Sequence, residues 1–165
     1  MKRIAIIALV SYLAFALEFL LVNFWGQWGK PELLILVVIF FNLYLGIRFS
    51  IIAAVFCGIF KDVSGVGPFG TYVLVYIVGA YVTTLVRRYL YEPGSRFSRA
   101  VVTFFVVIGC FCVQAVLANM SHEVDSQRFT SLLYYILAPQ LLTTMIAATY
   151  VFAQLKKIST FFVLK

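Results

Sequence analysis

The feature that most limits the fold of this chain is the apolar run at residues 4–22, in which Glu18 is the only charged residue. About 20 apolar residues in a helix span the hydrocarbon core of a bilayer. The whole chain is 64% hydrophobic and 12% charged, whereas soluble domains are about a quarter charged. Because no small-residue cleavage site follows the run, we interpret it as an uncleaved transmembrane helix rather than a signal peptide. The sequence therefore predicts one integral membrane domain, residues 1–165.

Further apolar segments follow along the chain. Three are long enough for single helices: 71–86, 100–119 and 131–153. The stretch 33–60 is interrupted at residues 46–50, and we predict two short helices there, 33–47 and 49–60. Fifteen residues of helix reach only about 22 Å, so either the bilayer thins around this hairpin or other helices enclose it. The predicted fold class is all-α, with six transmembrane helices in one bundle and a short hairpin of helices two and three.

The distribution of basic residues favours six helices over five. With six helices and a cytoplasmic N-terminus, ten of the thirteen Lys and Arg residues lie on the cytoplasmic side, as the positive-inside rule expects. A five-helix alternative places Arg48 at mid-membrane, which costs at least about 2.5 kcal/mol. We therefore predict a cytoplasmic membrane protein with both termini in the cytoplasm.

Small residues recur every four positions before and along the predicted third helix, and the series ends in a carboxylate. Its members are Gly46, Ser50, Ala54, Gly58 and Asp62. Residues four apart share a helix face, and small faces allow helices to approach closely in membranes. We expect a tight seam against another helix, either of this chain or of a partner protein.

A turn rich in glycine follows Asp62. Its residues are Gly65, Gly67, Pro68 and Gly70, which favour a tight connection to the next helix. Thr71 is a candidate N-cap of that helix. Asp62 could accept hydrogen bonds from the turn amides or pair with Lys61 or Lys30. A role in gating, substrate recognition or partner recognition stays open, because carboxylates at membrane depth are often functional.

Other polar residues lie at or near membrane depth, namely Glu18, Asn42, Arg48, Gln114 and Gln140, and three of them are candidates for a polar interior: Glu18, Asn42 and Gln114. They could converge in a polar pocket, or each could make separate hydrogen bonds between helices. We favour the separate hydrogen bonds. Glu18 in particular needs a partner, neutralisation or a wet cavity, because an isolated charge at this depth is costly.

The sequence gives no sign of enzymatic chemistry. Neither a nucleophile with a base, nor a phosphate-binding loop, nor paired catalytic carboxylates is present. The lone histidine, His122, has no second histidine or cysteine nearby, and the three cysteines lie in apolar segments. We predict no catalytic residues, no metal, no cofactor and no nucleic-acid partner; the lipid bilayer is the expected surrounding.

Residues 31–82 resemble the MreD family. The resemblance rests on Lys30-Pro31-Glu32 before helix two, Gly46 in the hairpin, Gly58-x-x-x-Asp62, the glycines at 67 and 70, and Gly79. The family usually has Pro-Asp or Pro-Asn where this chain has Pro31-Glu32. The resemblance implies a non-catalytic scaffold of the bacterial elongasome. It further implies binding to MreC, a membrane-anchored protein with an extracytoplasmic domain, and indirect action with RodA, the elongation transpeptidase and MreB in lateral peptidoglycan synthesis and rod shape.

A second resemblance comes from another functional class. A six-helix bundle of this size is also similar to the substrate-binding subunits of energy-coupling-factor vitamin transporters, in which Glu18, Asn42 and Gln114 would line a ligand pocket. A proton-coupled carrier that uses Asp62 and Glu18 is a weaker alternative, because such carriers usually contain inverted repeats and none is visible.

Overall fold

The described part of the chain is a bundle of helices. The computed structural model describes residues 2–25, 30–65, 68–90, 96–121 and 138–162. All secondary structure in these ranges is helical, which confirms the predicted all-α class. The helices are α1 Lys2–Trp25, α2 Leu33–Leu45, α3 Ile47–Ser64, α4 Thr71–Leu90, α5 Arg96–Ser121 and α7 Ala138–Phe162. The first part of the predicted helix 131–153 lies outside the described residues.

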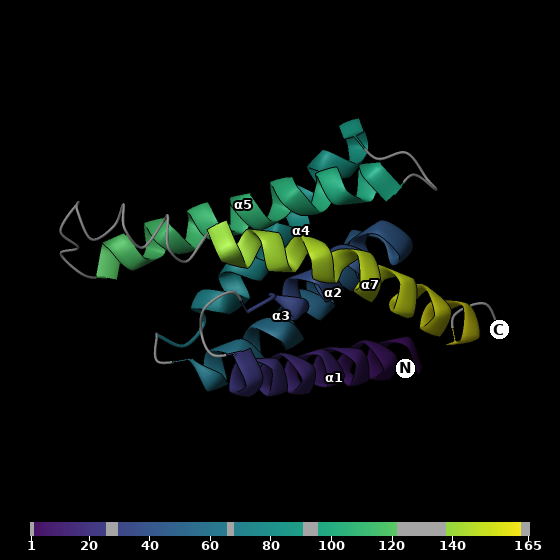
Figure 1. Cartoon of the computed structure of the whole chain (residues 1–165), viewed down its shortest axis with the longest axis horizontal. Helices are drawn as coiled ribbons and strands as arrows, with labels where there is room; N and C mark the ends of the chain where they lie inside the picture. Colours follow the sequence, from purple (N-terminus) through teal and green to yellow (C-terminus); the bar gives the residue numbers. More distant parts are fainter. Residues whose placement is uncertain (1, 26–29, 66–67, 91–95, 122–137, 163–165) are drawn as a thin grey trace.

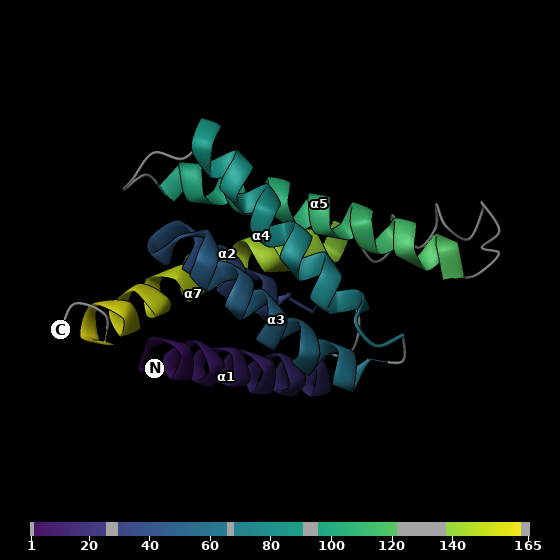
Figure 2. The same ribbon diagram turned by 180° about the vertical axis from the view of Figure 1, so that it is seen from behind.

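Helix α2 is the centre of the bundle. It is buried without a break from Leu33 to Leu43, and it contacts each of the other described helices. Figure 1 shows α5 above it, α1 below it and α7 crossing in front of it, and Figure 2 shows α3 between α1 and α4. Its 13 residues reach about 20 Å, less than the roughly 30 Å hydrocarbon core. The sequence analysis expected either a thinner bilayer or enclosure by other helices around such a short helix. The structure shows α2 enclosed by other helices.

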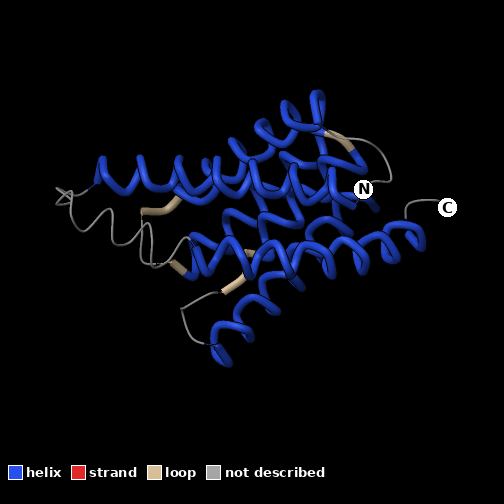
Figure 3. The backbone as a smooth tube through the Cα atoms, turned by 45° about the horizontal axis from the view of Figure 1, so that its top comes forward, coloured by secondary structure: helices blue, strands red, loops and turns tan. Residues whose placement is uncertain are grey.

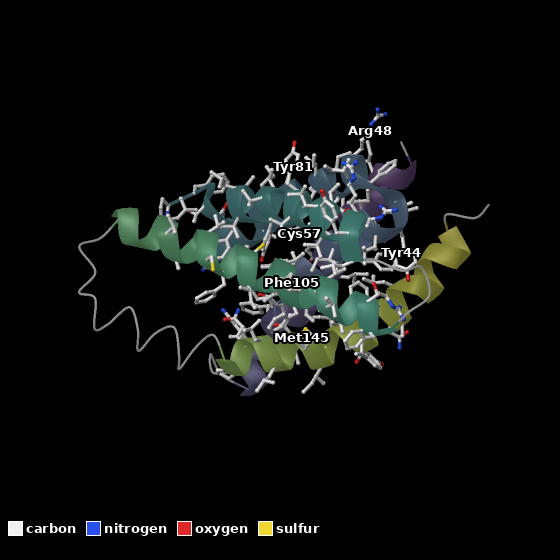
Figure 4. The ribbon with its side chains drawn as sticks, turned by 90° about the horizontal axis from the view of Figure 1, so that it is seen from above. Tyr44, Arg48, Cys57, Tyr81, Phe105 and Met145 are labelled. Atoms are coloured by element: carbon white, nitrogen blue, oxygen red, sulfur yellow. The ribbon has the colours of Figure 1, made fainter. Side chains whose placement is uncertain are left out.

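Gly46 separates α2 from α3. Its φ angle of 90° lies in the left-handed region that glycine adopts without strain. Arg48 follows on the first turn of α3 and is exposed. Figure 4 shows Arg48 and Tyr44 at one end of the bundle, away from the middle of the helices. The predicted break into two helices is confirmed, and the five-helix alternative with a central Arg48 is wrong.

The third helix is longer than the sequence predicts. It continues to Ser64 rather than ending at residue 60, so Lys61 and Asp62 lie on its last turns instead of in a loop. The polar atoms of both side chains have partners within the bundle, described below, and for this reason they do not end the helix.

The start of α1 and the end of α7 lie at the same end of the bundle. The first residues of α1, the connection between α2 and α3, and the last turns of α7 are all at that end (Figures 1 and 3). The end of α1, the start of α2, the end of α3 and the start of α4 lie at the opposite end. This arrangement agrees with an even number of passes.

Three of the described helices are long and apolar enough to cross a bilayer. They contain the segments Ile4–Asn23, Thr71–Leu90 and Phe97–Leu117, and α2 is a shorter apolar helix. These helices characterise the chain as a membrane protein. The predicted count of six spanning helices stays a prediction.

The small residues of α3 form a seam inside the chain. Ser50, Ala54, Gly58 and Asp62 are all buried. The Ser50 hydroxyl donates to the Val38 carbonyl of α2 at 3.0 Å. A Cβ atom on Gly58 would lie only 2.4 Å from the Cα atom of Val73 on α4. Within this chain the seam therefore packs against α2 and α4, and contact between its face and a partner protein stays a prediction.

We predict that Gly58→Ala destabilises the protein by about 1–3 kcal/mol, the usual cost of overfilling a packed site. The new methyl group meets backbone atoms of α4, which cannot rotate away as a side chain could. Thermal unfolding of the purified protein in mild detergent measures the loss.

Gly109→Ala is the matched control, because its Cβ would meet the Val82 side chain at an ordinary 3.7 Å. Equal unfolding temperatures for the two variants would contradict the close approach of α3 and α4.

Candidate functional site

A buried ion pair joins α1 and α3. Lys61 on α3 donates from Nζ to Oε1 of Glu18 on α1, and both residues are buried. The other carboxylate oxygen of Glu18 accepts a hydrogen bond from the backbone N–H of Leu34 at 3.4 Å. This N–H belongs to the first turn of α2, where helix amides lack partners within their own helix. One carboxylate therefore joins three helices.

Aromatic and amide groups extend this ion pair to α4 and α5. The Lys61 ammonium lies 5.8 Å from the centre of the Tyr72 ring, a distance at which a cation is attracted to an aromatic face. Gln114 on α5 donates from Nε2 to the Tyr72 hydroxyl at 3.0 Å.

Glu32 joins α7 to the same region. It immediately precedes α2, and its backbone N–H donates to the Thr144 hydroxyl of α7 at 3.2 Å. Its side chain is hydrogen-bonded to Gln140, also on α7, and it feels the charges of Lys61 and Glu18. We call the whole set the polar cluster. Its members are Glu18, Glu32, Lys61, Tyr72, Gln114, Gln140 and Thr144.

Sequence reasoning missed the main partners in this cluster. A pair with Lys61 was one of the alternatives left open for Asp62, but Lys61 pairs with Glu18 instead. Glu32 was noted only as part of a motif. The available signal was that a lone acid in the first apolar run needs a cation, and that Lys61 directly follows an apolar segment.

Asp62 caps α4 from the neighbouring helix. Its Oδ2 accepts hydrogen bonds from the N–H groups of Gly70 at 3.0 Å and Val73 at 3.3 Å, and its Oδ1 accepts one from Tyr72 at 3.0 Å. A carboxylate at a helix N-terminus satisfies free amides and interacts well with the helix dipole. Gly70 reaches this turn with a φ of 99°. The sequence analysis considered the turn amides, Lys61 and Lys30 as partners of Asp62. In the structure, Asp62 is hydrogen-bonded to the turn amides.

Thr71 does not act as the predicted N-cap. It is the first residue of α4, and its hydroxyl donates to the Pro68 carbonyl at 2.8 Å. Gly65 is the residue after the end of α3, and Gly67 lies outside the described residues.

Asn42 lies away from the polar cluster. Its Nδ2 donates to the Ala80 carbonyl at 2.8 Å and to the Thr84 hydroxyl at 2.9 Å, both on α4. It is eight residues beyond Leu34, or about 12 Å along α2. Glu18 and Gln114 connect through Lys61 and Tyr72, whereas Asn42 does not join them. The three residues therefore do not form one pocket, and the interpretation as separate contacts agrees with the geometry.

The described residues contain no cluster of three or more potential metal ligands. Cys57, Cys110 and Cys112 are free thiols, and Cys57 is 3.4 Å from the Ser11 hydroxyl. What the arrangement does provide is a set of buried charges that depend on one another. Removing one partner of such a pair leaves an uncompensated buried charge, which costs about 3–5 kcal/mol.

These features define a helical membrane protein in which polar contacts tie α1, α3, α4 and α7 to a central helix, α2, or to its start. The chain belongs to the MreD family: the family model, described as rod shape-determining protein MreD, matches residues 1–159. The match confirms the resemblance seen at residues 31–82 and extends it over nearly the whole chain. No curated protein and no solved structure gives a match.

We predict that Asp62→Ala destabilises the protein by about 1 kcal/mol, within the usual 0.5–2 kcal/mol for a lost N-cap. Three backbone N–H groups at the start of α4 lose their acceptor. The unfolding temperature in detergent measures the effect, and Asp62→Asn, which keeps one acceptor oxygen, should lose less.

Ser64→Ala serves as the control, because Ser64 is exposed on the same turn of α3 and its hydroxyl bonds only to the Lys61 carbonyl. If Asp62→Ala is no less stable than this control, Asp62 does not hold the start of α4.

Proposed function

We propose that this chain is a non-catalytic scaffold subunit of the elongasome, which binds MreC and supports lateral peptidoglycan synthesis and rod shape. The observation that carries the proposal is the MreD family match over residues 1–159, which makes the chain a rod shape-determining membrane protein. Through MreC it acts with RodA, the elongation transpeptidase and MreB.

The interior of the bundle supports a scaffold role. A partner helix in a membrane is recognised by shape and hydrogen bonding, because lipid tails are as apolar as the helices themselves. A surface with a fixed shape needs helices that do not slide. The polar cluster and the Gly58 contact fix α1, α3 and α4 around α2. We propose that the seam from Gly46 to Asp62 holds this geometry, and that MreC contacts an exposed part of the bundle.

We further propose that the protein is a multi-pass protein of the bacterial cytoplasmic membrane with both termini in the cytoplasm. Arg48 lies at the end of the bundle that carries both termini (Figure 4). Arg87 reaches the same region, where its Nη1 donates to the Asn42 carbonyl near the end of α2. Basic residues at this end favour the cytoplasmic side. The polar cluster then lies toward the extracytoplasmic side.

The test replaces the chromosomal copy in the source bacterium with a tagged copy under depletion control. Proteins that copurify in mild detergent are identified by mass spectrometry, and cell width is measured by microscopy. We expect MreC among the copurified proteins and round cells on depletion. Gly58→Ala should weaken MreC recovery, and Gly109→Ala should not.

Two results would contradict the proposal. One is normal rod shape after depletion, with membrane levels of the tagged protein confirmed before depletion. The other is recovery of an ATPase module with a coupling subunit in place of MreC, which would indicate a transporter subunit.

A further inference from the structure

Two tyrosines lie near the middle of apolar segments and face outward from the bundle. Tyr81 is near the middle of the segment Thr71–Leu90 on α4, and Tyr12 is near the middle of the segment Ile4–Asn23 on α1. Their exposed fractions are 53% and 55%. Figure 4 shows Tyr81 at the edge of the bundle that lies opposite α7. On the surface of membrane proteins, tyrosine side chains are instead enriched near the two membrane–water interfaces.

The hydroxyl groups of these two tyrosines have no partner inside the described part of the chain. Among the described residues, neither oxygen makes a hydrogen bond. A hydroxyl without a partner is unfavourable in hydrocarbon. The interface lies about 15 Å from the middle of the hydrocarbon core, which is too far for a tyrosine side chain to reach. Lipid tails alone therefore do not satisfy these hydroxyl groups.

Tyr12 borders the outer face of α3. Its ring centre lies 6.1 Å from that of Phe60 on α3, and Phe60 is stacked against Phe15 of α1 with 5.6 Å between the ring centres. Aromatic rings at such distances attract one another. These contacts place Tyr12 directly beside α3.

Tyr81 borders α3 from the other side. Val73 on α4 packs against Gly58 of α3, and residues four apart on a helix share a face. The row from Val73 through Ile77 to Tyr81 therefore follows the contact between α4 and α3. Because α3 lies between α1 and α4 (Figure 2), the two tyrosines flank the outer face of α3.

The outer face of α3 between these tyrosines is apolar. Its residues are spaced by three and four positions, as one side of a helix requires, and they are Ile52, Phe56, Ile59 and Val63. Ile52 and Phe56 are only partly exposed, so this part of the surface is less exposed than the tyrosines beside it. We call Tyr12, Tyr81 and these four residues the tyrosine-flanked face.

We propose that the tyrosine-flanked face receives one membrane-spanning helix of another protein. This helix lies along α3 between Tyr12 and Tyr81, and near its middle it carries hydrogen-bonding side chains such as serine, threonine, asparagine or glutamine. Such side chains join helices within membranes, where lipid tails are as apolar as the helices. A second copy of this chain fits less well, because two surfaces that are each lower in the middle leave a space between them.

The inference rests on the proposed function in assuming a membrane partner, and it adds the surface which that partner uses. Site-specific photocrosslinking in the source bacterium tests it. Benzoylphenylalanine, a photoreactive amino acid, replaces Tyr12 or Tyr81 in the tagged full-length chain, and crosslinked peptides are sequenced by mass spectrometry. We expect both positions to crosslink to a membrane-spanning segment of the same protein. Ile146, which is 72% exposed on α7, is the control position and should not crosslink to that segment.

Removal of the two hydroxyl groups is the second test. Tyr12→Phe and Tyr81→Phe should each raise the apparent Kd for the crosslinked protein about 3- to 30-fold, the range for one hydrogen bond between membrane helices. The unfolding temperature of the free protein should not change, because neither hydroxyl bonds to another described residue. Tyr150→Phe, at an exposed position of α7, is the matched control and should leave the Kd unchanged.

Three results would overturn the inference. They are crosslinks from both positions to lipid alone, crosslinks to a second copy of this chain, and an unchanged Kd in both phenylalanine variants. If MreC copurifies while both positions crosslink to lipid alone, the face is wrong and the scaffold proposal stands. If depletion leaves rod shape normal while both positions crosslink to one membrane-spanning segment, the scaffold proposal is wrong and the face stands.

Discussion

The Glu18–Lys61 ion pair is the interaction on which the rest of this bundle depends. Moving two charged groups out of water costs several kcal/mol for each group. This cost is offset only when the two charges contact each other directly and their remaining polar atoms are hydrogen-bonded. Glu18 meets this requirement with Lys61 on one oxygen and the Leu34 N–H on the other. Because these groups come from α1, α3 and the start of α2, the three helices have one relative position that satisfies the charges.

Helix α2 is consequently held by polar groups at both of its ends. Its start lies in the polar cluster. Near its end, the Asn42 side chain bonds to α4, and the Asn42 carbonyl accepts from Gly46 and Arg87. Between these ends every side chain is apolar and buried. A helix too short to cross the bilayer is in this way fixed in depth and in rotation.

The sequence was sufficient for the class of protein and for the break at Gly46, because apolar run length and a glycine interruption are local signals. The four-residue spacing in α3 also predicted a close-packed face. The partners of Lys61 and Asp62 were not predictable, since they depend on how α1 and α4 are rotated against α3. The length of α3 was misjudged for the same reason. Two adjacent charged residues, Lys61 and Asp62, are typical of a loop in sequence, and only the structure shows that each has a partner inside the bundle.

A double-mutant cycle on Glu18→Gln and Lys61→Met tests the account most directly. The unfolding free energy of each variant is measured in the same detergent. Each single change should cost about 3–5 kcal/mol, because it leaves one buried charge unpaired. The double variant should lose far less than the sum, since no isolated charge remains. Additive losses would show that the two residues do not interact, and the arrangement of α1, α2 and α3 described above would then be wrong.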